Sequence, residues 1–133
     1  MPHLVMLYSQ NLEREVDFSA LTRAIADTMI AQRDSLGKQV FPTGGTRVFA
    51  YPAPHSAIAD GKGDYGFLYA NLRMASGRTP EVHKSVGDEI SAVLKSYMSE
   101  IMERKPVGIT VQIDESPGQV YDNKMSSLHP LFR

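Results

Sequence analysis

Pro2 has the most distinctive chemistry of any residue in this sequence. Removal of Met1 would convert it into a free secondary amine. An α-amino group titrates at about 7.7 to 8.0, a value that apolar burial or nearby cations lower, so such an amine can act as a general base at neutral pH. The apolar run from Leu4 to Tyr8 predicts that the chain starts in the core, with the amine at the rim of a pocket. The alternative is an exposed second residue without a chemical role, and if Met1 stays attached the Pro2 nitrogen is an amide without basicity.

Two arginines occupy positions where a ligand could reach them. Arg47 follows the turn-forming pair Gly44 and Gly45, and Arg78 directly precedes Thr79 in a predicted loop between a strand and a helix. A guanidinium can hold a carboxylate through two parallel hydrogen bonds, which suits a small dicarboxylate or tricarboxylate substrate. For each arginine the alternative is a structural ion pair or a solvated surface charge.

Composition excludes several other chemistries. There is no cysteine, so disulfides and thiolate sites are ruled out, and a net charge of -1 gives no electrostatic reason to expect nucleic acid or an anionic membrane as partner. No apolar run is long enough for a signal peptide or a membrane span, so we expect a cytoplasmic protein. The histidines show no metal-ligand spacing, and we predict neither a metal nor another cofactor; they are His3, His55, His83 and His129.

The hydrophobic pattern predicts four strands and two helices in one domain spanning residues 1–133. The expected strands cover residues 4–8, 46–51, 65–74 and 107–114, with Pro52 and Pro54 ending the second. The first helix is expected over 18–33 after the N-cap Asp17, and the second begins at Pro80 after Thr79 and ends before Pro106. Its apolar stripe is expected to consist of Val82, Val86, Ile90, Val93, Leu94, Tyr97 and Ile101.

This order, strand-helix-strand twice, predicts an α/β (α+β) fold in which two βαβ units form a four-stranded mixed sheet. Two helices cannot cover both faces of such a sheet. Because the first and third strands carry consecutive apolar residues, we expect another copy of the chain to cover the second face, and hence an oligomer. The tail from Gln119 to Arg133 is expected to dock on a neighbouring subunit through its apolar residues, Leu128, Leu131 and Phe132.

Five short motifs, taken in order, resemble the 5-carboxymethyl-2-hydroxymuconate Δ-isomerase family of the tautomerase superfamily. The likeness runs nearly end to end and is strongest at the two termini and at the loop before the second helix. The motifs are Met1-Pro2-His3, Phe41-Pro42 with Gly45 and Arg47, Asp64-Tyr65-Gly66-Phe67, Gly77-Arg78, and Leu128-His129-Pro130-Leu131-Phe132.

The resemblance implies a homotrimeric, cofactor-free isomerase of aromatic catabolism. In it the amine of Pro2 removes the 2-hydroxyl proton of a dienol and returns a proton further along the conjugated chain, while Arg47 and Arg78 bind the carboxylates of a small polycarboxylate. This chain has Phe49 where some members carry a second basic residue, and a longer connection over residues 33–40. The alternatives are another activity of the superfamily, a decarboxylase or dehalogenase using the proline as an acid, and a catalytically silent trimeric binding protein.

Overall fold

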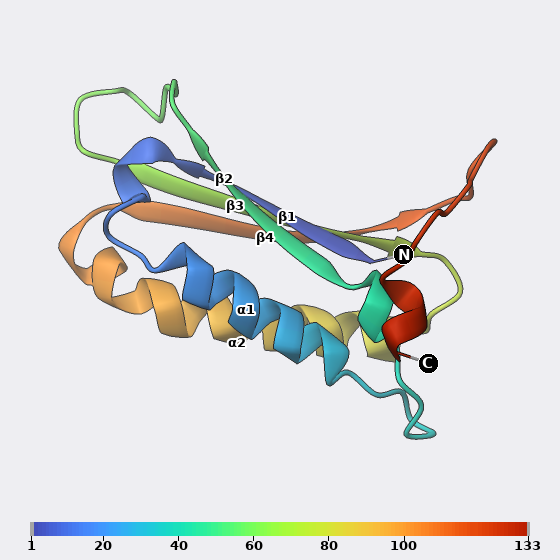
Figure 1. Cartoon of the computed structure of the whole chain (residues 1–133). Helices are drawn as coiled ribbons and strands as arrows, with labels where there is room; N and C mark the ends of the chain where they lie inside the picture. The colour runs from blue at the N-terminus through green and yellow to red at the C-terminus, as the bar shows by residue number, and fades with distance from the viewer. Residues whose placement is uncertain (1, 133) are drawn as a thin grey trace.

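The computed structural model describes residues 2–132 as a sheet with two helices packed on one side (Figure 1). The elements in chain order are β1 (His3–Ser9), η1 (Gln10–Leu12), α1 (Phe18–Ile30), η2 (Thr43–Gly45), β2 (Arg47–Ala53), β3 (Gly66–Ala75), α2 (Pro80–Arg104), β4 (Val107–Ser116) and η3 (His129–Phe132), where η marks a single 3-10 turn. The strand order is β2-β1-β3-β4. Within each βαβ unit the strands are parallel, and β1 and β3 join the units in antiparallel fashion, which confirms the predicted mixed sheet.

Both helices begin at the predicted capping residues. The side chain of Asp17 accepts a hydrogen bond from the backbone N–H of Ala20 at 3.0 Å, and Thr79 accepts one from Val82 at 3.3 Å. Neither helix described is long and apolar enough to cross a membrane.

Three predicted details of these elements are wrong. α1 ends at Ile30 rather than at Arg33, because Arg33 forms a β-bridge with Gln39 as the chain reverses. β2 continues through Pro52, which an edge strand tolerates because one side of its backbone has no strand partner. On α2 the buried stripe contains Met98, whereas Tyr97 is 36% exposed.

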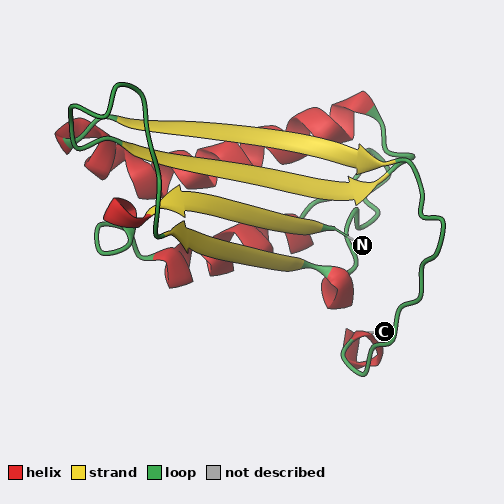
Figure 2. Ribbon diagram, turned by 90° about the horizontal axis from the view of Figure 1, so that it is seen from above, coloured by secondary structure: helices red, strands yellow, loops and turns green. Residues whose placement is uncertain are grey.

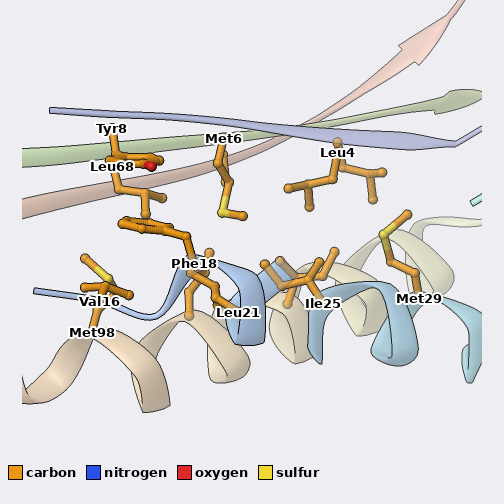
Figure 3. Packing of buried hydrophobic residues seen from close by; sticks show 14 of the residues in the cluster. Leu4, Met6, Tyr8, Val16, Phe18, Leu21, Ile25, Met29, Leu68 and Met98 are labelled. Atoms are coloured by element: carbon orange, nitrogen blue, oxygen red, sulfur yellow. The ribbon is translucent and has the colours of Figure 1, made fainter. Parts of the chain in front are cut away.

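The hydrophobic core lies between the sheet and the helices, where alternate residues of β1 point toward α1 (Figure 3). Leu4, Met6 and Tyr8 are buried there, and the ring of Tyr8 stacks on that of Phe18 with 3.7 Å between the centroids. Burying the start of β1 in this way fixes the N-terminal end of the chain against the sheet.

The opposite face of the sheet is not covered by either helix (Figure 2). It carries large apolar side chains that are between 41% and 49% exposed: Leu7, Phe49, Tyr51 and Phe67. The β2 and β1 half of this uncovered face is the more apolar, since on the other half Tyr69 donates a hydrogen bond to Gln112 and Asn71 donates one to Asp114.

The C-terminal segment arches round the end of the sheet at which the N-terminus lies (Figure 2). It ends in η3, which packs against η2 of the same chain, so closely that a Cβ atom on Gly44 would lie 2.8 Å from the Cα of His129. At this contact the tail docks within its own chain, while its docking on a neighbouring subunit stays a prediction. Three apolar side chains of the tail stay at least 54% exposed, namely Leu128, Leu131 and Phe132.

Candidate functional site

The sheet brings four side chains into one row at the end where β1 begins. His3 is level with Arg47 of β2 and with Arg73 of β3, and Arg73 is level with Asp114 of β4. Directly paired residues point to the same side of a sheet, and His3 alternates with the buried Leu4. This end row, Arg47, His3, Arg73 and Asp114, therefore lies on the uncovered face.

Pro2 is buried immediately before β1. Continuing the register of β1 by one residue places it level with Thr46 of the neighbouring loop and Met74 of β3. By the same alternation Pro2 lies with Leu4 on the helix-covered side, so it adjoins the end row only through the backbone at His3, and it lines none of the three clefts described below.

Arg47 contacts His3 directly. One of its terminal nitrogens donates to the carbonyl of Gly45 at 3.0 Å, and the other lies 3.3 Å from Nδ1 of His3. Because a guanidinium can only donate, Nδ1 accepts this bond and the imidazole carries its proton on Nε2. Partial burial, and then the charges of Arg47 and Arg73, lower the pKa of His3, so the ring is a neutral N–H donor at pH 7.

Arg78 ties two loops together. Its terminal nitrogens donate to the carbonyls of Ala75 and Val40, both at 2.9 Å, and its guanidinium carbon lies 5.2 Å from the centre of the buried ring of Phe41. Gly77, with a φ of 107°, makes the turn that permits this geometry, and that backbone conformation favours glycine.

Two clefts open beside the end row, and His3 lines both. One has a volume of about 530 Å³ and includes Arg73, whereas the other, of about 540 Å³, includes Arg47. Both are also lined by Gln119, Asp122 and Lys124 of the C-terminal segment, so the clefts adjoin beneath it.

Arg78 lines a third cleft of about 1060 Å³, which meets the first at Ala75 and Ser76. Of the three residues predicted for the site, the structure thus brings Pro2 and Arg47 to the start of β1 and places Arg78 on a neighbouring cleft. Sequence reasoning missed Arg73, whose proximity to His3 depends on the antiparallel pairing of β1 and β3.

The end row has more positive than negative charge. Among residues 2–132, Arg73 makes no hydrogen bond or ion pair with another side chain, while Asp114 accepts its described hydrogen bond from Asn71 at 2.8 Å. Asp122 pairs with Lys124 and does not neutralise the row. Two guanidiniums therefore flank a neutral imidazole, an arrangement that attracts anions.

Comparison with known proteins identifies the family. The family model described as 5-carboxymethyl-2-hydroxymuconate isomerase matches residues 2–132. The chain belongs to this family. An Escherichia coli 5-carboxymethyl-2-hydroxymuconate Delta-isomerase is 25% identical to it, with both chains covered in full.

Solved structures agree with the family match. A crystal structure of a 5-carboxymethyl-2-hydroxymuconate delta-isomerase is 49% identical and superposes with a TM-score of 0.95, covering 100% of this chain and 93% of the other. A 5-carboxymethyl-2-hydroxymuconate isomerase from Deinococcus radiodurans R1 is 26% identical, with a TM-score of 0.87 and coverage of 99% and 94%. A fused 4-OT, described as a symmetric trimer, shares the fold alone at 20% identity, with a TM-score of 0.56 and coverage of 96% and 98%.

These findings confirm the predicted tautomerase-like fold and the predicted class of enzyme. The chain is an isomerase of the tautomerase superfamily. The decarboxylase, dehalogenase and catalytically silent alternatives are not favoured.

Proposed function

We propose that the chain ketonises a small unsaturated 2-hydroxy polycarboxylate of the 5-carboxymethyl-2-hydroxymuconate kind, with the amine of Pro2 as general base. The family membership carries the proposal, and the geometry supports it. Pro2 lies at the buried start of β1, next to a row with excess positive charge and two clefts of a size suited to a small molecule. The proposed setting is the catabolism of aromatic compounds in the cytoplasm.

In the proposed reaction the unprotonated amine of Pro2 takes the proton of the 2-hydroxyl group. The electron pair of the broken O–H bond forms the ketone, the conjugated double bonds shift, and the proton that the amine holds is delivered to a carbon further along the chain. No atom or electron is gained or lost, so no co-reactant is needed. The amine returns to its neutral state for the next turnover.

Surrounding charge would keep this amine neutral. Burial and a nearby guanidinium both disfavour an ammonium group, and each unit by which they lower a pKa corresponds to about 1.36 kcal/mol. Arg47 and Arg73 are both level with His3, one residue from Pro2, and are the described cations of the end row beside the amine. The residue that binds a substrate carboxylate would then also activate the base.

Arg47 and Arg78 are proposed to bind substrate carboxylates. Each uses two N–H groups on partners within the protein, and a guanidinium has five, so both keep donors for a ligand. Arg78 lies farther from the end row and would reach the substrate through the junction of clefts at Ala75 and Ser76.

A homotrimer is the proposed assembly. The half-exposed apolar side chains of the uncovered face provide a surface for contact with other copies, and a protein sharing the fold is described as a symmetric trimer. Sedimentation of the purified protein tests this assembly, since a monomer at micromolar concentration would contradict it.

The base is tested with protein shown by intact mass to begin at Pro2. Ketonisation of 2-hydroxymuconate-type dienols is followed by ultraviolet absorbance, and Pro2→Ala is expected to lower kcat by at least about 100-fold while the circular dichroism spectrum stays unchanged. Pro54→Ala, at an exposed loop position, is the matched control.

The pH dependence separates a base from an acid. For the unsubstituted protein kcat/KM should rise with pH as the amine loses its proton, whereas an acid role predicts a fall. A Pro2 variant with the unsubstituted rate would overturn the proposal.

A further inference from the structure

Arg73 is the charged side chain of the end row that the described structure leaves without a partner. It is exposed on the uncovered face, level with His3 on one side and Asp114 on the other. Asp114 is committed to Asn71, so no described carboxylate hydrogen-bonds to Arg73. Within the described chain this guanidinium therefore keeps its N–H groups for an anionic ligand.

The spacing of Arg47 and Arg73 suits a ligand with two negative ends. Neighbouring strands lie about 4.8 Å apart, so two strand spacings separate the backbones of these arginines by roughly 10 Å. His3 lies between them with its Nε2 proton available, since Nδ1 accepts from Arg47. Across the three strands the row thus presents a cation, a neutral hydrogen-bond donor and a second cation.

The positions of the two clefts also suit a ligand that reaches from Arg47 to Arg73. Arg73 lines the cleft on one side of His3 and Arg47 lines the cleft on the other, and both clefts run beneath the same residues of the C-terminal segment. An elongated ligand lying across His3 would therefore place one end in each cleft.

We propose that Arg73 is a carboxylate-binding residue that selects dicarboxylates over monocarboxylates. Arg47 binds the carboxylate at one end of the ligand, Arg73 binds the carboxylate at the other, and the imidazole of His3 donates a hydrogen bond between them. The inference rests on the proposed function only in that both place the substrate at the start of β1. It adds a specificity residue that neither the motifs nor the family match indicated.

Two diene acids of equal length test the proposal. Muconate is a six-carbon diene with a carboxylate at each end, and sorbate has the same carbon skeleton with a carboxylate at one end only. Neither has a 2-hydroxyl group, so binding is measured by titration calorimetry without turnover. The unsubstituted protein should bind muconate at least about tenfold more tightly than sorbate, and Arg73→Gln should abolish that preference while changing sorbate affinity by less than about a factor of two.

The control is Arg23→Gln, which removes the same charge from an exposed site on α1, where Arg23 pairs with Asp27. It should leave the preference for muconate intact. Equal binding of the two acids by the unsubstituted protein, or retention of the preference in Arg73→Gln, would overturn the proposal. If the preference depends on Arg73 but no dienol is ketonised, the carboxylate site stands and the proposed function fails.

Discussion

At the scale of single residues, Arg78 combines a structural role with its proposed role in binding. Its guanidinium bonds to carbonyls in two loops and lies over the ring of Phe41. The ion pair or solvated charge weighed as its structural alternative does not describe these contacts. A substitution at Arg78 should therefore affect stability as well as substrate binding.

We expect Arg78→Ala to lower the free energy of unfolding by about 1 to 3 kcal/mol, because two carbonyls lose a charged donor and the face of Phe41 is uncovered. Urea denaturation measures the change. Arg104→Ala is the control, since Arg104 makes exposed ion pairs with Glu15 and Glu100 that contribute no more than about 1 kcal/mol. If both variants lose the same free energy of unfolding, the contacts of Arg78 with the two loops stabilise the protein no more than an exposed ion pair does.

His3 gives the site a dependence on pH. Partial burial, Arg47 and Arg73 lower its pKa, so the folded protein binds a proton at His3 less readily than the unfolded chain does. The stability contributed by neutral His3 is fully present above the unfolded value of about 6.5 and is lost as the pH falls through the lowered value.

A nuclear magnetic resonance titration of the His3 imidazole should give a pKa below about 6.5, and Arg47→Gln should raise it because one nearby positive charge is removed. In His3→Asn, which keeps an acceptor for Arg47, this component of the pH dependence of unfolding should disappear. A pKa unchanged by Arg47→Gln would contradict the assigned contact.

At the scale of elements, α2 shows how tertiary packing selects one face of a helix. Its N-cap and its start followed from Thr79 and Pro80, as predicted. Tyr97 and Met98 are adjacent apolar residues, and the packing buries Met98 fully while Tyr97 stays partly exposed. Partial exposure lets water form hydrogen bonds with the phenolic hydroxyl of Tyr97.

We expect Met98→Ala to lower the free energy of unfolding by about 2 to 5 kcal/mol, because it leaves a cavity in a fully packed core. Met102→Ala makes the same chemical change one turn later, where the side chain is 44% exposed, and should cost less than about 1 kcal/mol. Thermal or urea unfolding compares the two. A similar loss in both would mean that the assigned face of α2 is wrong.

At the scale of the whole molecule, one face of the sheet is covered by neither helix of the chain. The apolar half formed by β2 and β1 exposes Leu7, Phe49 and Tyr51, while the other half forms its own polar contacts. Subunit contact is therefore expected first on the apolar half.

Phe49→Lys should convert the proposed trimer into monomers that keep their secondary structure, because it places a charge in an apolar contact. Analytical ultracentrifugation combined with circular dichroism checks both parts. Leu36→Lys is the matched control on a loop, at a side chain 90% exposed, and should leave the oligomer intact. A Phe49→Lys protein of unchanged sedimentation would place the subunit interface elsewhere.

The sequence by itself determined the order of the elements and the starts of both helices, because caps and hydrophobic periods are local signals: Asp17, Thr79 and Pro80 mark where the helices begin. It also led to the family through the order of its motifs. The roles of Pro2, Arg47 and Arg78 in the site also come from this resemblance and stay predictions.

Tertiary structure alone decided which distant residues meet. His3 and Arg73 are level only because β1 and β3 run antiparallel in one register, and a shift by one residue would move Arg73 to the helix-covered face. Arg78 reaches Val40 because two loops close on the buried Phe41. Such pairings depend on the free energy of packing the whole sheet against both helices, which no local stretch of sequence contains.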